Sequence, residues 1–169
     1  MTVDGEELRS LQAPLKDRYR SDPVAAKVTL RAAGQLAGDD LSCSVETGRA
    51  LVEAGLHPAT GGDGTLVCSG DMLLQALAAC AGVTLRAVAA SLGIDVRGGA
   101  VHVEGDLDFR GTLSVDREAP VGFSDVRVAF ELDTDASPKD LDTLLRLTER
   151  YCVVGQTLQR PPTTSFRHH

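Results

Sequence analysis

The chain has 169 residues, of which 43% are hydrophobic and 24% are charged, and its formal net charge is -7 with a pI near 5.0. These totals are typical of one globular domain with a sizeable core. The acidic balance and the lack of a basic stripe argue against nucleic-acid binding and against attraction to anionic membranes. Residues 1–22 are charged throughout and carry no apolar signal-peptide core, so a cytoplasmic protein is expected.

The four cysteines do not predict a disulfide framework, and no two of them have C-x-x-C spacing. The four histidines form no zinc-binding pattern with them, so neither a metal nor a cofactor is expected. His168 and His169 end the chain and carry no expected role. The thiols are therefore either packed in a core or chemically reactive.

The first 23 residues are charged and partly helical, and we expect them to form a solvated arm before a single domain at residues 24–169. Residues 28–32 and 41–46 alternate apolar and polar side chains, which predicts two strands joined as a hairpin through a turn at residues 38–40. Residues 55–70 are rich in glycine and predict a loop. This loop has no G-x-x-x-x-G-K pattern, so it is not expected to bind phosphate.

Residues 70–92 predict a long central helix, because almost all of them are good helix formers or small. Ser69 is the expected N-cap, and Gly93 is expected to end the helix. Asp71 lies in the first turn, where the helix dipole favours a carboxylate. The segment is apolar on almost every side, which predicts burial on several sides.

This helix is long enough to cross a membrane, but its composition favours a core helix of a soluble protein. It is rich in alanine and contains the polar residues Asp71, Gln75 and Arg86. A charge in the middle of a membrane span costs several kcal/mol. One thiol, Cys80, lies in the middle of the segment.

Two clear alternating strands follow the central helix, and each predicts one buried and one wet face. The apolar positions of the first are Val101, Val103, Leu107 and Phe109, which alternate with His102, Glu104, Asp106 and Asp108. The apolar positions of the second are Val126, Val128, Phe130 and Leu132.

Ser137 and Pro138 are typical of a helix start, so a second helix is predicted from there. Its expected inner face consists of Leu141, Leu144, Leu145 and Thr148. Residues 149–158 continue as a helix or turn sharply, and residues 163–167 are a possible short edge strand. The order of hairpin, helix, hairpin, helix and strand predicts an α+β fold rather than a doubly wound parallel sheet.

Cys80 and Cys152 lie in or beside the two predicted helices, where a free cysteine is often a small core residue. The surrounding motifs point to a different role. Glycines occupy positions 61 and 62, residues 71–80 read DMLLQALAAC, and residues 150–158 read RYCVVGQTL. Together these motifs resemble the OsmC/Ohr family of organic-hydroperoxide reductases, and the resemblance runs from the first strand to the last.

The resemblance implies an intertwined α+β homodimer in which antiparallel sheets wrap around a buried central helix. It implies that Cys80 is the peroxidatic cysteine and that Cys152 is the resolving one. Asp71 takes the place of the glutamate of the family, and Arg49, or alternatively Arg31, takes the place of its arginine. Position 153 is Val where many relatives have Pro.

Physical chemistry adds constraints on a reactive Cys80. Burial in an apolar helix raises a thiol pKa, so an activated thiolate needs a nearby cation. Arg86 is six residues along the helix and projects to another face, so the cation is expected from another segment, with Arg49 favoured. Asp71 lies on the opposite face of the helix and about 13 Å along its axis. A two-fold dimer is one way to bring Asp71 of one subunit near Cys80 of the other.

Three further residues have mainly structural interpretations. Cys43 is expected to face inward from its strand, and Cys68 lies at the entrance of the central helix. His57 is expected to be a loop residue rather than a catalytic base, because it has no evident partner in the sequence.

Two functions remain in view. The first is a peroxidase that reduces organic hydroperoxides through a Cys80 sulfenic acid, which Cys152 resolves as a disulfide. The resemblance suggests that a lipoyl-type dithiol or another small thiol then resets it. The second is a non-catalytic homodimer that binds an apolar ligand in the pocket around Cys80.

Overall fold

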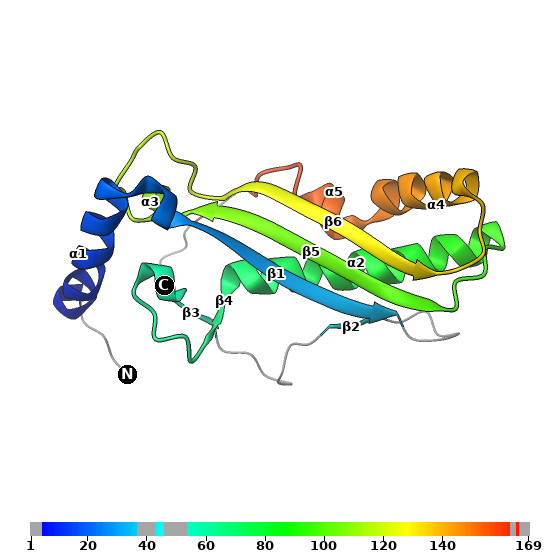
Figure 1. The fold of residues 1–169 in the computed structure, drawn as a ribbon, viewed down its shortest axis with the longest axis horizontal. Helices are drawn as coiled ribbons and strands as arrows, with labels where there is room; N and C mark the ends of the chain where they lie inside the picture. Colours follow the sequence, from blue (N-terminus) through cyan, green and yellow to red (C-terminus); the bar gives the residue numbers. More distant parts are fainter. Residues whose placement is uncertain (1–4, 37–42, 46–53, 163–164, 166–169) are drawn as a thin grey trace.

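The structure is a computed structural model, and it describes residues 5–36, 43–45, 54–162 and 165. Figure 1 shows a twisted sheet with a long helix lying along one of its faces. The elements in chain order are α1 (Gly5–Ser21), η1 (Pro23–Ala26), β1 (Lys27–Leu36), β2 (Cys43–Val45), β3 (Ala54–Gly55), η2 (Pro58–Thr60), β4 (Val67–Cys68), α2 (Ser69–Leu92), β5 (Gly98–Asp108), α3 (Phe109–Thr112), β6 (Phe123–Asp133), α4 (Pro138–Tyr151) and α5 (Val153–Thr157).

The main sheet has four antiparallel strands in the order β2-β1-β5-β6. Both predicted hairpins are confirmed, since β1 pairs with β2 and β5 pairs with β6. The α+β class is confirmed as well. Within the single chain, α2 is covered by this sheet and by helices α4 and α5, rather than being wrapped by antiparallel sheets.

The alternation in β5 holds through its first half, where Val101 and Val103 are fully buried. It fails at the end of the strand. Asp108, expected on the wet face, is only 6% exposed, and Phe109 is not in the strand but begins α3. The reason is that the Asp108 carboxylate caps α3, accepting a hydrogen bond from the backbone N–H of Arg110 at 3.1 Å.

The central helix α2 forms the core with the inner face of the sheet and with α4. Its side chains Leu74, Leu77 and Leu85 pack with those of Val101, Val103 and Leu144. Gly93 ends the helix as predicted, with a positive φ of 67°. The predicted N-cap is wrong by one residue, because Cys68 holds that position and makes no side-chain cap hydrogen bond.

By length and composition alone, α2 is apolar enough to cross a membrane. It is nevertheless packed against β1, β5, α4 and α5 of the same chain. This packing favours the core helix that the sequence predicted.

Helix α4 begins as the sequence predicted, because the Ser137 hydroxyl accepts a hydrogen bond from the Asp140 N–H at 3.3 Å. Leu144 and Thr148 face inward and are buried, whereas Leu145 is 41% exposed and is not part of the inner face. The helix ends at Tyr151, and Cys152 forms a sharp junction with α5. This is the turn that the sequence offered as one of two alternatives.

The N-terminal arm is helical, as expected, but it is more than a solvated extension. Tyr19 is only 3% exposed and packs with Ala26, Phe109 and Leu113 in a second small core. The Tyr19 hydroxyl donates a hydrogen bond to the Ala59 carbonyl at 2.8 Å. The arm is therefore fastened to the glycine-rich segment before α2.

The glycine-rich segment is partly regular, since it contains η2 and the parallel pair β3 and β4. His57 caps η2 by accepting a hydrogen bond from the Ala59 N–H through Nδ1 at 3.0 Å. Its ring also stacks on Phe109, with ring centroids 4.9 Å apart. Both contacts are structural, in line with the interpretation of His57 as a loop residue.

The two glycines of the motif are needed for the shape of this segment. Gly61 has a positive φ of 95° and ends η2. A Cβ atom at Gly62 would lie 1.8 Å from the Leu56 carbonyl oxygen, which no side chain tolerates. The glycine pair therefore fixes how the chain enters β4 and α2.

Candidate active site

The candidate site is the place where the thiols of Cys80 and Cys152 meet. Cys80 is half-buried in the middle of α2, and Cys152 is only 4% exposed at the junction of α4 and α5. The two thiols lie close enough for each to affect the pKa of the other. Both thiols are free in this structure. The packing of α4 and α5 on α2 thus joins two cysteines that are far apart in the sequence.

The surroundings of Cys80 act on its pKa in opposite directions. Burial raises the pKa, but hydrogen bonds to the sulfur outweigh burial, so the pKa of Cys80 lies below its ordinary value. The strongest of these hydrogen bonds comes from the backbone N–H of Val154. The Cys152 thiol, the Thr84 hydroxyl and the N–H of Val153 add to it. The Thr84 Oγ1 atom lies 4.0 Å from the Cys80 sulfur.

Cys152 responds in the opposite way. Burial raises its pKa most, and the contact with Cys80 raises it further. The backbone N–H of Gly155 donates a hydrogen bond to the Cys152 sulfur at 3.4 Å, which only partly offsets the increase in pKa. The pKa values of the two thiols therefore shift in opposite directions, downward at Cys80 and upward at Cys152.

A groove of about 570 Å³ reaches Cys152 between β6 on one side and helices α4 and α5 on the other. Apolar side chains of α2, β6, α4 and α5 form most of its wall. They include Leu77, Val126, Phe130, Leu145 and Leu158. Thr148 also lines the groove, and its buried hydroxyl has no hydrogen-bond partner.

Of the other predicted site residues, Asp71 does not lie beside Cys80 within one chain. Asp71 is half-buried in the first turn of α2, nine residues before Cys80, and thus lies about 13 Å away along the helix axis. Arg49 lies outside the described residues. Arg31 is in β1, where the strand register places it opposite Glu104. Arg86 donates a hydrogen bond to the Val96 carbonyl, so it faces away from Cys80 as expected.

The remaining cysteines are not part of the pair. Cys68 is half-buried at the N-cap of α2, and the side chain of Cys43 lies outside the described part of the structure. Within the described ranges, no group of three His, Cys, Asp or Glu side chains is placed to hold a metal ion.

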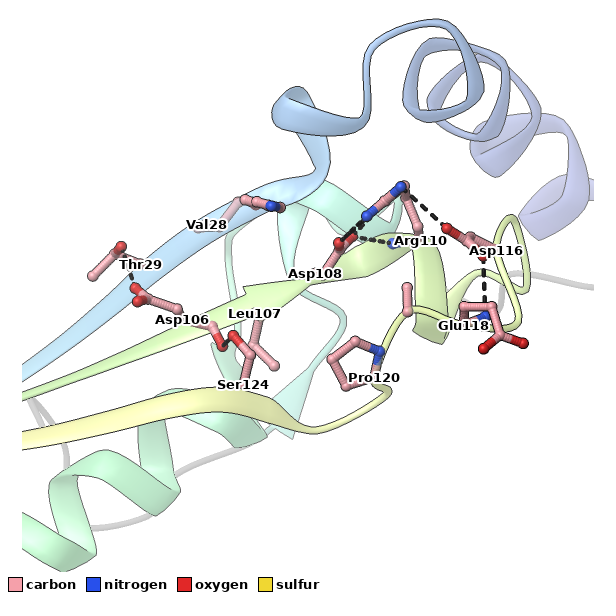
Figure 2. A pocket seen from close by; sticks show the side chains of 12 residues that line it. Val28, Thr29, Asp106, Leu107, Asp108, Arg110, Asp116, Glu118, Pro120 and Ser124 are labelled. Carbon is pink, nitrogen blue, oxygen red and sulfur yellow. Dashed lines mark hydrogen bonds and ion pairs between the residues drawn. The ribbon is translucent and has the colours of Figure 1, made fainter.

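A second cavity, of about 670 Å³, lies beside α3 and shares no lining residue with the groove. Figure 2 shows Arg110 bridging Asp108 and Asp116 in this cavity. The Thr29 hydroxyl donates to Asp106 at 2.6 Å in the same region. These contacts tie β1, the end of β5 and the segment after α3 together.

Sequence reasoning missed the hydrogen-bond donors around Cys80. Thr84 is one helical turn after Cys80, and that spacing was a usable signal. The backbone N–H groups of Val153 and Val154 gave no signal, because any residue carries one.

Comparisons with known proteins agree with this fold. The family model of OsmC-like proteins matches residues 62–167, which is more than half of the chain. An OsmC-like hydroperoxide resistance protein from Jannaschia sp. CCS1 has a similar structure, with a TM-score of 0.61 and 18% identity, over 85% of this chain and 94% of that one. An OsmC-like protein from Mycoplasma pneumoniae matches with a TM-score of 0.55 and 16% identity, over 75% of this chain and 85% of that one.

No curated protein matches the sequence. The family match spans both cysteines, the central helix, and the segment from β5 to α5 that brings Cys152 to Cys80. The long helix on an antiparallel sheet is thus the fold that this chain shares with the two solved structures. By this match and this fold, the chain belongs to the OsmC-like protein family.

Proposed function

We propose that the protein is a thiol-dependent peroxidase that reduces organic hydroperoxides to alcohols. The Cys80 thiolate attacks one peroxide oxygen, the O–O bond breaks, and the alcohol leaves with a proton. Cys80 is then a sulfenic acid. The Cys152 sulfur attacks the Cys80 sulfur, and the hydroxyl leaves as water with the Cys152 proton. The resulting Cys80–Cys152 disulfide is the two-electron oxidised form of the pair, and an external dithiol then reduces it.

The observation that carries this proposal is the direct contact of two thiols whose pKa values shift in opposite directions. The lowered pKa supplies a nucleophilic thiolate at Cys80. The raised pKa keeps Cys152 protonated until the sulfenic acid has formed.

The nature of the peroxide follows from the surroundings of the pair. The walls near the thiols are mainly apolar, which favours organic hydroperoxides over hydrogen peroxide. The similar Jannaschia protein is described as a hydroperoxide resistance protein, and this supports the same substrate class here.

We also propose that the working unit is a homodimer. The side of α2 that its own sheet does not cover exposes Ala76, Val83, Ala87 and Ala90. Val83 is 40% exposed although it lies in the middle of the helix. A second copy packed there buries this face. The dimer also allows Asp71 of one subunit to lie near Cys80 of the other, whereas the two residues are far apart within one chain.

The test is turnover of cumene hydroperoxide with dithiothreitol as the reductant. We expect the wild type to be active and Cys80→Ser to be inactive. In a separate reaction without dithiothreitol, Cys152→Ser is expected to consume one equivalent of peroxide, stop at a sulfenic acid on Cys80, and over-oxidise with excess peroxide. Cys68→Ser is the matched control and is expected to keep full activity. Activity that survives in Cys80→Ser contradicts the proposal, and apolar-ligand binding without turnover by the wild type favours the non-catalytic alternative.

A further inference from the structure

The thiol pair brings two soft sulfur atoms close to each other in a mainly apolar part of the fold. Cys80 and Cys152 are both free thiols, and both pack on the main hydrophobic core. The backbone N–H groups that reach the Cys80 sulfur belong to Val153 and Val154, which directly follow Cys152 in the chain. Both sulfurs therefore lie at the start of α5, where one small cation has access to the two of them.

The number of ligands at the pair limits which metal ion fits. In the part of the chain that the structure describes, no third His, Cys, Asp or Glu side chain joins the two cysteines in a possible metal site. Zn²⁺ takes four ligands in structural sites and three protein ligands in catalytic sites, so two thiols do not satisfy it. Cu(I) prefers soft thiolate ligands and is stable between two sulfurs alone. The ligand set therefore favours Cu(I).

The charge of such a complex suits the surroundings of the two sulfurs. Two thiolates and one Cu(I) carry one negative charge in total, the same charge as the Cys80 thiolate alone. The N–H groups of Val153 and Val154 reach the Cys80 sulfur. The Gly155 N–H donates to the Cys152 sulfur at 3.4 Å. Hydrogen bonds to metal-bound sulfur stabilise thiolate ligands, so donors on both sulfurs offset the charge of the complex.

A cation also has a path to the pair. The groove of about 570 Å³ reaches Cys152, and its described lining contains one carboxylate, Glu149, and no basic side chain. The whole chain carries a net charge of -7. A positive ion is therefore attracted rather than repelled on its way to the sulfurs. The carboxylate is a hard oxygen ligand, so it does not compete with two thiolates for Cu(I).

We propose that Cys80 and Cys152 of the reduced protein together bind one Cu(I) ion as a two-coordinate bis-thiolate. The binding depends on the two thiols and the donors around them, and it does not rest on the proposed peroxidase function. No electron is transferred when the complex forms. Cu(I) displaces the proton of Cys152, and also that of Cys80 where this thiol is not ionised, and the displaced protons pass to the solvent.

The first experiment measures copper binding by the reduced full-length protein in the absence of oxygen. Cu(I) is supplied as its coloured complex with bathocuproine disulfonate, and the colour fades as the protein takes the metal. We expect the wild type to bind one Cu(I) per chain. Cys80→Ser and Cys152→Ser are each expected to bind it about a hundredfold more weakly, because one of two sulfur ligands is lost. Cys68→Ser is the matched control and is expected to bind like the wild type. Undiminished binding in either variant of the pair, or lost binding in Cys68→Ser, overturns the proposal.

The second experiment uses the wild type alone, so it does not depend on whether a variant folds. The reduced protein is treated with N-ethylmaleimide with and without one equivalent of Cu(I), and peptide mass mapping locates the label. Copper is expected to slow labelling of Cys80 and Cys152 together and to leave that of Cys68 unchanged. Protection of Cys80 alone, or of Cys68 alone, overturns the proposal.

A Cys80–Cys152 disulfide also blocks labelling, so excess bathocuproine disulfonate is then added to remove the metal. Labelling of both cysteines is expected to return, and protection that persists is oxidation and overturns the proposal. Neither experiment uses peroxide, so their results are independent of whether the protein turns over hydroperoxides.

The third experiment tests the number of ligands. Zn²⁺ replaces Cu(I) in the labelling assay, and an equimolar amount is expected to give no protection, because two thiols leave its tetrahedral coordination incomplete. X-ray absorption of the copper-loaded wild type is expected to show two sulfur neighbours and no nitrogen or oxygen neighbour. Equal protection by Zn²⁺, or a third ligand in the spectrum, overturns the two-coordinate site.

Discussion

At the scale of single residues, the central feature is the set of groups that lower the pKa of Cys80. The groups that lower its pKa are neutral hydrogen-bond donors, namely two backbone N–H groups of α5, the Cys152 thiol and the Thr84 hydroxyl. Such donors stabilise the charged form directly, without the desolvation cost of bringing a cation into an apolar helix. Arg49 lies outside the described residues, so an added role for it stays a prediction.

The first prediction concerns the pH dependence of Cys80. Because its pKa lies below the ordinary thiol value of 9.0, alkylation of Cys80 by iodoacetamide is expected to reach its plateau at a lower pH than that of an ordinary thiol. In Thr84→Val the thiolate loses one donor, so the midpoint is expected to move to higher pH. Peptide mapping at each pH separates Cys80 from Cys152.

Thr143→Val is the control for this prediction, and its midpoint is expected to match the wild type. A wild-type midpoint at or above that of Cys152 contradicts the assignment of Cys80 as the nucleophile. An unshifted midpoint in Thr84→Val shows that the backbone donors alone hold the thiolate.

The residue scale also shows where sequence reasoning succeeds and where it stops. The resemblance identified Cys80 and Cys152 as a pair, and their contact follows from the packing of α4 and α5 on α2. Reasoning from charge led to a search for an arginine. The argument from charge did not predict the N–H groups of Val153 and Val154. The direction of a backbone N–H is set by the path of the chain, which the sequence does not give.

At the scale of secondary-structure elements, patterning predicted the strands and helices better than their ends. Alternation located β5 and β6, and the capping residues Ser137 and Gly93 located helix ends correctly. The alternation of apolar and polar residues gave a wrong prediction at Asp108, because it assumes that the strand continues. There the chain turns into α3, and the side chain expected to face water becomes a buried cap. A local tertiary partner, Arg110, makes that burial possible.

The second prediction concerns this junction of β5 and α3. Arg110 donates hydrogen bonds to Asp108, the shortest at 2.6 Å, and these hold the pKa of the Asp108 carboxyl below its usual value of 3.8. Asp108→Asn keeps the helix cap but removes the charge, so we expect a loss of about 2 kcal/mol in unfolding free energy at pH 7. Urea denaturation of the wild type and of Asp108→Asn measures this difference.

The pH dependence of this difference gives a second check. A carboxyl whose pKa is lowered on folding contributes its full stabilisation above the unfolded pKa and loses it as the pH falls through the folded pKa. The gap between wild type and Asp108→Asn is therefore expected to be constant above about pH 5 and to shrink below pH 3.8. A gap that stays the same in acid shows that the ion pair with Arg110 does not stabilise the fold.

At the scale of the whole molecule, the single chain leaves one helix face incomplete. The sheet covers one side of α2 and helices α4 and α5 cover another, while Ala76, Val83, Ala87 and Ala90 remain exposed. Soluble proteins seldom leave the middle of an apolar core helix uncovered. Cys80 lies at the border of this face, since it is half-buried and one turn from both Ala76 and Val83 along the helix. Association through this face is therefore expected to change the surroundings of Cys80 as well as the stability of the chain.

The last prediction is that the protein is a homodimer through this face and that the dimer is needed for full activity. Sedimentation at micromolar concentration is expected to show a dimer for the wild type and a monomer for Val83→Arg, because the added charge is buried without a partner in the dimer but is solvated in the monomer. Leu92→Arg is the matched control, since Leu92 is 41% exposed on the same helix but lies on another face, and it is expected to stay dimeric. The Val83→Arg monomer is expected to lose most peroxidase activity, because the second copy supplies the cover of Cys80 and the approach of Asp71. A wild-type monomer in sedimentation contradicts the dimer, and a fully active Val83→Arg monomer shows that one chain holds the complete site.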